Sequence, residues 1–205
     1  EPDAGQVFLA GDAADAMPAP LWRRRMGFVV QSAGLFPHMT VAQNVSVTPR
    51  LLGWEDARIS RKVDELLDMA GLDPSTYRSR RPAELSGGQR QRVGLARALA
   101  GEPELVLMDE PFSALDPETK EGLIDQIRAM REALGFAAVI VTHDFGEALA
   151  LADQIAVMQA GRIMQCAPAR ELINNPASPE IATLLDAPRR AAERIAAVFG
   201  EPHVK

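Results

Sequence analysis

The sequence predicts an α/β fold, in which helices cover both faces of a sheet. Two runs of uniformly apolar residues, "LVLM" at 105–108 and "AAVIVT" at 137–142, are too short for surface helices and are typical of strands buried on both faces. Each run is followed by a stretch with helical spacing of apolar residues, so that strands and helices alternate along this part of the chain.

The elements before residue 100 divide into strand and helix. The short apolar runs at 6–9 and 27–31 have strand character. From about residue 44 to 85 the pattern is helical, and Gly71 ends one of these helices. The apolar residues that recur at helical spacing there are Ile59, Val63, Leu66, Leu67 and Ala70.

After residue 105 the local signals are helix caps and turns. Asp116 followed by Pro117 is a standard helix start, and Asp144 can cap the helix after residue 142. The runs 155–158 and 162–165, joined by "QAG", predict a hairpin. From Pro188 onward, the helical spacing of Ile195, Val198 and Phe199 predicts a C-terminal helix.

We therefore expect a single domain over residues 1–205. Its core sheet lobe takes in 1–43 and 101–175, a helical lobe takes in 44–100, and a helical tail takes in 176–205.

The composition is that of a globular protein without a membrane span. The net charge is −6, which argues against a general nucleic-acid binder. Cys166 is the single cysteine, so an internal disulfide framework is excluded. No stretch approaches the roughly 18 consecutive apolar residues of a membrane-spanning helix, and the N-terminus has no secretory-signal pattern.

Ser86, Gly87 and Gly88 stand at the start of a predicted helix. Glycines let backbone N–H groups approach an anion closely, and the helix N-terminus adds partial positive charge there. Ser86 can cap the helix or donate to a phosphate oxygen. Taken alone, this tripeptide favours a plain capped turn.

Polar side chains follow three of the predicted strands. Asp109 ends the strand at 105–108 and is well placed to bind Mg²⁺, while Glu110 can polarise an attacking water. His143 ends the next strand and can bond a terminal phosphate. Gln31 ends the strand at 27–31 and offers an amide to metal or water. The alternatives are that Asp109 and Glu110 stand at an ordinary strand–loop junction and that His143 is a structural histidine.

Four motifs together resemble the ATPases of ATP-binding cassette (ABC) transporters. "LSGGQRQRVGLARAL" at 85–99, "LVLMDEPFSALDP" at 105–117, "VTHD" at 141–144 and "VVQ" ending at Gln31 are similar to the signature, the Walker B motif with D-loop, the H-loop and the Q-loop of that family. The resemblance implies a P-loop NTPase-like, RecA-like sheet core with a helical lobe that bears the signature, and ATP and Mg²⁺ as cofactors.

The resemblance also implies roles in a head-to-tail dimer, where the signature of one subunit caps ATP held by the other. Asp109 would serve Mg²⁺, Glu110 would be the general base, and His143 the switch histidine. Gln31 would contact the metal and couple the site to the membrane subunits. The residues implied to meet the γ-phosphate or the opposite subunit are Ser86, Gly87, Gly88, Gln89 and Asp116.

A finer resemblance is to the ATPases of osmoprotectant importers, and it rests on residues 34–54 and 71–94. It implies transport of glycine betaine, carnitine, choline or related quaternary amines. The implied partners are a second ATPase subunit, transmembrane permease subunits and, indirectly, a periplasmic or lipid-anchored substrate-binding protein, with no nucleic acid. The implied location is the cytoplasmic face of the membrane. Importers of sugars, phosphonates or metals share parts of these strings.

The sequence has no P-loop. Its three lysines are Lys62, Lys120 and Lys205, and none follows a glycine or precedes Ser or Thr. We therefore expect the N-terminal part with the P-loop to be missing, one sheet face to be uncovered, and residues 1–205 alone to hydrolyse no ATP. The alternatives are a naturally P-loop-less paralogue that acts as a non-catalytic partner, and a soluble ABC ATPase of DNA repair or translation.

Overall fold

The computed structural model describes residues 2–186 and 190. It divides into two compact units, Glu1–Val141 and Thr142–Lys205, which we describe separately. The helix predicted from Pro188 onward lies outside the described residues. The residues just before it, 179–186, are helical. Among the described helices, none combines the length and the apolar character needed to cross a bilayer.

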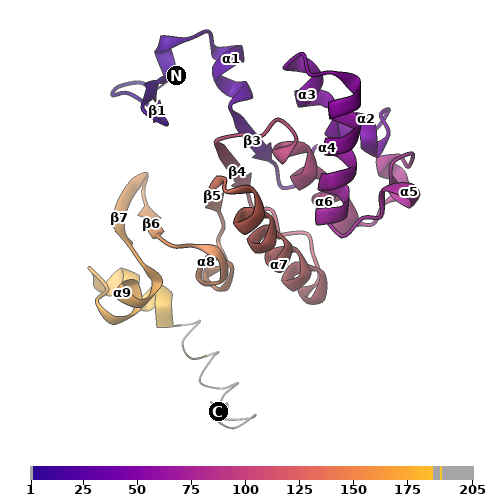
Figure 1. The fold of residues 1–205 in the computed structure, drawn as a ribbon. Helices are drawn as coiled ribbons and strands as arrows, with labels where there is room; N and C mark the ends of the chain where they lie inside the picture. Colours follow the sequence, from indigo (N-terminus) through magenta and orange to yellow (C-terminus); the bar gives the residue numbers. More distant parts are fainter. Residues whose placement is uncertain (1, 187–189, 191–205) are drawn as a thin grey trace. The chain divides into compact units, whose positions relative to one another are not determined.

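The first unit is built on a three-stranded parallel sheet (Figure 1). Its strands are β3 (Met26–Val29), β4 (Leu105–Asp109) and β5 (Ala137–Val141), with β4 in the centre. Val29 pairs with Met108, and Asp109 pairs with Val141. Because the strands are parallel, the chain segments that follow them leave at the same edge of the sheet.

The two faces of this sheet differ in burial. One face carries Val29, Val106 and Met108, each at most 2% exposed. It packs against α6 (Gly87–Leu99), since a Cβ atom on Gly27 would lie within 3.0 Å of the backbone of Ala98. The other face carries Phe28, Val139 and Val141, each more than half exposed. The expectation of an uncovered face is thus confirmed, and the prediction that 137–142 is buried on both faces is wrong.

Helices follow one another between β3 and β4. They are α2 (Val41–Val45), α3 (Val47–Leu51), α4 (Asp56–Met69), α5 (Pro74–Tyr77), the 3₁₀ turn η2 (Pro82–Glu84) and α6. The predicted apolar stripe of α4 is confirmed, because Ile59, Val63 and Leu66 are buried. Gly71 follows with φ +67°, a left-handed conformation that favours glycine and ends the helix. Helix α7 (Pro117–Leu134) then joins β4 to β5.

A small hairpin opens the first unit. Strands β1 (Phe8–Leu9) and β2 (Asp12–Ala13) pair antiparallel, and a 3₁₀ turn η1 (Ala14–Ala16) and helix α1 (Ala19–Arg24) follow. Arg25 then bonds the Asp12 carboxylate at 2.8 Å and the Glu104 carboxylate at 2.7 Å. This ion pair ties the opening hairpin to the start of β4.

The second unit contains the predicted hairpin. Its elements are α8 (Phe145–Leu151), β6 (Ile155–Gln159), β7 (Arg162–Ala167) and α9 (Ala169–Asn174). β6 and β7 pair antiparallel, which confirms the prediction, and Ala160 and Gly161 both have positive φ in the tight turn. The core of this unit gathers Ile155, Ala167, Leu172, Ile181 and Leu185.

Candidate functional site

The carboxyl end of β4 presents the two predicted acidic residues. Asp109 is the last residue of the strand and is exposed. Glu110 has φ +44°, which is uncommon for a residue other than glycine. Its N–H donates to the carbonyl of Val141 at 2.9 Å, and its carbonyl accepts from the Ser113 hydroxyl at 3.1 Å. These bonds hold a strained backbone in place, as is often seen at functional sites.

The loop that contains Gln31 leaves the sheet at the same edge. Gln31 lies two residues beyond β3 and is exposed. The turn is tight, since the Ala33 N–H donates to the Val30 carbonyl at 2.8 Å and both Ala33 and Gly34 have positive φ. Because β3 is the direct neighbour of β4, the structure brings the Gln31 loop and Asp109 to one edge of the sheet.

A residue that the sequence reasoning missed joins this loop to the acidic turn. Gln91, on α6, is only 4% exposed. Its Nε2 donates to the carbonyl of Gln31 at 2.8 Å and to the carbonyl of Pro111 at 2.8 Å. The signal that would have found it is an amide four residues before Leu95 on the buried side of a helix, where apolar residues are the rule.

A second missed residue is Arg97, further along α6. Its guanidinium donates to the carbonyls of Ala33 at 2.8 Å and Gly34 at 2.7 Å. Burial lowers the pKa of this arginine from its ordinary value. Between Gln91 and Arg97, Gly94 lets the helix approach the loop, since a Cβ atom there would lie 3.2 Å from the Cβ of Ala33.

The start of α6 is a capping box. Ser86 Oγ accepts from the Gln89 N–H at 3.2 Å, and Gln89 Oε1 accepts from the Ser86 N–H at 2.9 Å. Gln89 Nε2 also donates to the hydroxyl of Tyr77 at 3.0 Å. The capped-turn interpretation of this segment is therefore confirmed. The roles of Ser86 and Gln89 toward a phosphate stay predictions, and in this structure the Gln89 amide serves the fold.

The two glycines of the signature have different surroundings. Gly87 is exposed, whereas Gly88 is buried and a Cβ atom on it would lie within 3.0 Å of Thr119 Cγ2. Thr119 is in turn held by Asp116, which accepts from its N–H at 3.0 Å and from its hydroxyl at 2.6 Å. The hydrogen bonds from Thr119 hold the pKa of the Asp116 carboxyl below its ordinary value. The structure thus brings the signature and Asp116 together at the starts of α6 and α7.

His143 belongs to the second unit, in the link between β5 and α8. Its neighbours in the chain form several hydrogen bonds. The Asp144 N–H donates to Thr142 Oγ1 at 3.0 Å, and the Thr142 hydroxyl donates to the buried Glu147 carboxylate. Asp144 Oδ1 accepts from the Gly146 N–H at 2.8 Å, which confirms it as the cap of α8. His143 is exposed at this cap, and its role as a switch remains a prediction.

The described residues fit Mg²⁺ only as part of a metal–nucleotide complex. No group of three His, Cys, Asp or Glu among them could enclose a metal ion. Asp109 offers one exposed carboxylate, with the Gln31 amide on the neighbouring loop. Mg²⁺ usually takes one or two carboxylates and completes its octahedron with water and phosphate oxygens. The donor set therefore suits a metal that arrives with a nucleotide.

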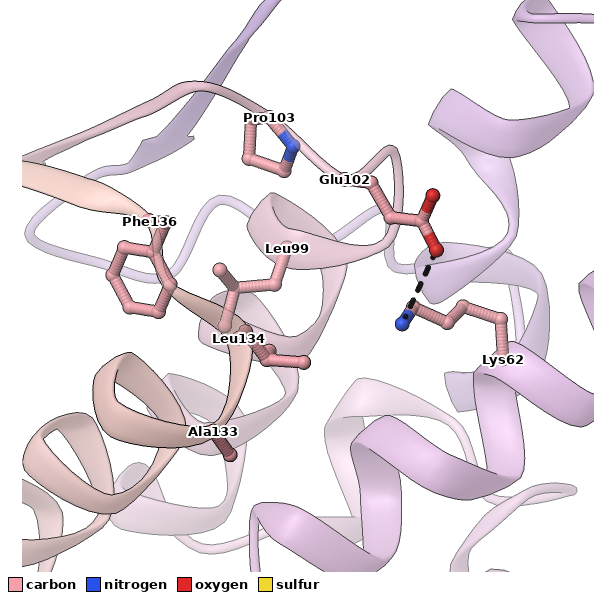
Figure 2. Close-up of a pocket in the computed structure, with 7 residues that line it drawn as sticks. All are labelled: Lys62, Leu99, Glu102, Pro103, Ala133, Leu134 and Phe136. Carbon is pink, nitrogen blue, oxygen red and sulfur yellow. Dashed lines mark ion pairs between the residues drawn. The ribbon is translucent and has the colours of Figure 1, made fainter.

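A pocket of about 350 Å³ in the first unit lies away from these residues. Figure 2 shows its lining, including the Lys62 ammonium 3.4 Å from the Glu102 carboxylate. Pro103 and Phe136 place it where β4 and β5 begin, opposite the edge that carries Asp109. Ligands of open α/β sheets bind outside the carboxyl ends of the strands, so we do not assign this pocket to the site.

The fold and the motifs define a nucleotide-binding cassette, and comparison with known proteins identifies its family. The family model described as ABC transporter matches residues 1–113, more than half of the chain. The chain belongs to the ABC transporter family.

The curated relatives extend this family assignment. The chain is 45% identical over 177 residues to the osmoprotectant import ATP-binding protein OsmV of Salmonella typhimurium, covering 86% of this chain and 46% of OsmV. It is 44% identical over 178 residues to the glycine betaine/carnitine/choline transport ATP-binding protein OpuCA of Bacillus subtilis, and the match covers 87% of this chain and 47% of OpuCA. A molybdate/tungstate import ATP-binding protein, WtpC of Thermococcus kodakarensis, is 44% identical over 185 residues, and the match covers 90% of this chain and 55% of WtpC. The chain spans about half the length of these relatives.

A solved structure agrees with the fold. The ATP-binding cassette MJ0796, in a dimeric post-hydrolysis state bound to ADP and Pi, superposes with a TM-score of 0.71 at 29% identity. The match covers 82% of this chain and 75% of MJ0796. The predicted ABC ATPase fold is therefore confirmed.

Proposed function

We propose that the protein expressed from its own gene binds and hydrolyses ATP as the energising subunit of an importer for osmoprotectants such as glycine betaine, carnitine and choline. Residues 1–205 alone, which contain no P-loop, would hydrolyse none. The observation that carries the proposal is the set of four motifs, in family order, on a chain 45% identical over 177 residues to OsmV. The relatives named for glycine betaine, carnitine or choline favour this substrate class over molybdate, although WtpC is almost as similar.

The chemistry follows from the residues at the carboxyl edge of the sheet. Asp109 and Gln31 would hold the metal of a magnesium–ATP complex, which supplies positive charge next to the phosphates. Glu110 would accept a proton from the attacking water. The backbone N–H groups at the start of α6, with Ser86, would donate to the γ-phosphate of ATP bound by a second copy, since a helix N-terminus favours an anion.

The assembly in this proposal is a head-to-tail pair of ATPase subunits. MJ0796, which resembles this chain in fold, has been solved as a dimer bound to ADP and Pi. Asp116 would lie at the dimer contact and His143 near the γ-phosphate. The pair would sit on the cytoplasmic face of the membrane against permease subunits, which receive substrate from a binding protein.

Uptake measurements test the proposal. A strain that lacks the gene should lose uptake of labelled glycine betaine, carnitine or choline at high salt, and the wild-type gene should restore it. The Glu110→Gln variant should not restore it, because loss of a general base slows the reaction by about 100-fold or more. Uptake of all three compounds that is unaffected by the deletion, with a loss of molybdate uptake instead, would contradict the substrate class.

A further inference from the structure

The two hydrogen bonds of Gln91 join two segments that are far apart in the sequence. One acceptor is the carbonyl of Gln31 itself, 60 residues away, and the other is the carbonyl of Pro111, 20 residues away. Pro111 directly follows Glu110. A single side chain therefore links the loop of the candidate metal ligand to the turn of the candidate general base.

The amide of Gln91 suits this link for a chemical reason. An NH₂ group has two N–H donors, and both are used here on carbonyl groups. Its Oε1 is buried and has no hydrogen-bond partner among the described residues. Since a buried, unsatisfied acceptor is unfavourable, burial alone would favour an apolar residue at this place. The two bonds to the site loops are the evident reason for an amide.

Among the described residues of α6, Gln91 hydrogen-bonds both segments. Gly94 and Arg97, further along the helix, contact the Gln31 loop at Ala33 and Gly34. Without Gln91, the Gln31 loop would keep the bonds from Arg97 to Ala33 and Gly34 but would lose the bond at Gln31 itself. The Glu110 turn would lose its hydrogen bond from Gln91.

We infer that Gln91 is a positioning residue, which holds the Gln31 loop and the Glu110 turn in register through the NH₂ group that bonds both. Any displacement of the start of α6 is passed to both segments together. This inference rests on the proposed ATPase function for its kinetic consequence, but the mechanical link can be measured without ATP.

The first experiment is amide hydrogen exchange on the protein expressed from its own gene, without nucleotide. Gln91→Met keeps an unbranched side chain of similar length and removes both donors. Gln91→Glu keeps the shape and replaces the NH₂ group with oxygen. Both variants should raise the exchange rate in residues 31–34 and in residues 110–113 by severalfold.

Gln126→Met is the matched control. Gln126 is an amide on α7 whose Oε1 is likewise buried without a partner in the described part of the chain. Its loss should leave exchange in both segments unchanged. A rise in only one segment for the Gln91 variants, or an equal rise in Gln126→Met, would overturn the inference.

The second experiment separates kcat from KM. Gln91→Met should lower kcat at least about tenfold while KM for ATP stays within about threefold, because misplaced groups slow chemistry more than they weaken binding. Gln126→Met should change neither. Equal kcat in wild type and Gln91→Met would overturn the inference. Absence of ATP turnover in the wild type would instead overturn the proposed function, and the exchange data would still decide the link.

Discussion

Gly88 shows how a signature glycine can be required by packing as well as by chemistry. Its neighbour Gly87 is exposed, and the nearest atom to a Cβ added there is the end of the Arg90 side chain at 4.0 Å. At Gly88, in contrast, the methyl group of Thr119 occupies the space of a Cβ. Thr119 cannot turn away without losing the hydrogen bond from its hydroxyl to Asp116. The contact therefore fixes the distance between the starts of α6 and α7.

We predict that Gly88→Ala lowers the free energy of unfolding by about 1–3 kcal/mol, the usual cost of an overpacked contact. Thr119→Ser removes the blocking methyl group and keeps the hydroxyl, so the double variant should recover most of the loss. Gly87→Ala, the matched control, should stay within about 0.5 kcal/mol of wild type. Urea denaturation measures all four proteins, and a double variant no more stable than Gly88→Ala would contradict the contact.

Asp116 should make stability depend on pH. The hydrogen bonds from Thr119 favour the charged carboxylate, so the folded protein holds its pKa below the ordinary value of 3.8. The stabilisation is therefore present above this value and is lost as the pH falls through the lower, folded pKa. We predict that the stability difference between wild type and Asp116→Asn narrows as the pH falls from 7 to below 3.

Urea denaturation across this pH range checks the prediction. Thr119→Val is the control, since it removes the hydroxyl that contributes most to the lowered pKa and keeps the side-chain shape. In that background, Asp116→Asn should show a smaller pH dependence. A stability difference that is the same at every pH would count against the role of the charge.

At the scale of elements, the parallel sheet is covered on one side. Residues that alternate along β3, β4 and β5 point to opposite faces, and the buried side chains Val29, Val106 and Met108 lie on the face toward α6. The runs "LVLM" and "AAVIV" show no alternation of apolar and polar residues, which is why the sequence predicts burial on both sides. The apolar side chains on the uncovered face include Phe28 and Val139.

The same substitution on the two faces tests this difference. We predict that Val106→Thr, at 0% exposure, lowers the free energy of unfolding of the 205-residue chain by about 1–3 kcal/mol, because it buries a hydroxyl group without an assured partner. Val139→Thr, at 52% exposure, should change it by less than about 0.5 kcal/mol. Thermal denaturation of both variants provides the measurement, and equal losses would contradict a one-sided sheet.

At the scale of the whole molecule, the proposed site needs two copies. Glu110 would act on ATP that the signature of the other subunit caps, so each site in a homodimer takes Glu110 and Ser86 from different chains. Two defects placed in different chains can then leave one site intact. This property separates a shared site from one that is complete within a single chain.

We predict that Glu110→Gln and Ser86→Arg are each inactive, but that a mixture regains roughly a quarter of wild-type ATP hydrolysis. Random pairing makes half of the dimers mixed, and each mixed dimer has one of its two sites intact. The phosphate-release rate is measured on the protein expressed from its own gene, with each variant alone as control. No gain on mixing would contradict the head-to-tail arrangement.

Local signals in the sequence predict the elements that depend on neighbouring residues. The spacing of Ile59, Val63 and Leu66 predicts α4, and Asp116 and Asp144 cap α7 and α8 as predicted. The hairpin of β6 and β7 followed from two apolar runs around a short turn. These features depend on residues within a few positions of one another, and the chemistry of a cap or a turn acts at that range.

By itself, the sequence determined the family, the order of the motifs and the type of the longer elements, because periodicity, caps and motif spacing are properties of neighbouring residues. Only the tertiary structure decided that Gln91 bonds carbonyl groups 60 and 20 residues away, that Thr119 fills the space beside Gly88, and which sheet face is covered. These contacts depend on how distant segments meet once the core has formed, and no local pattern of residues encodes that distance.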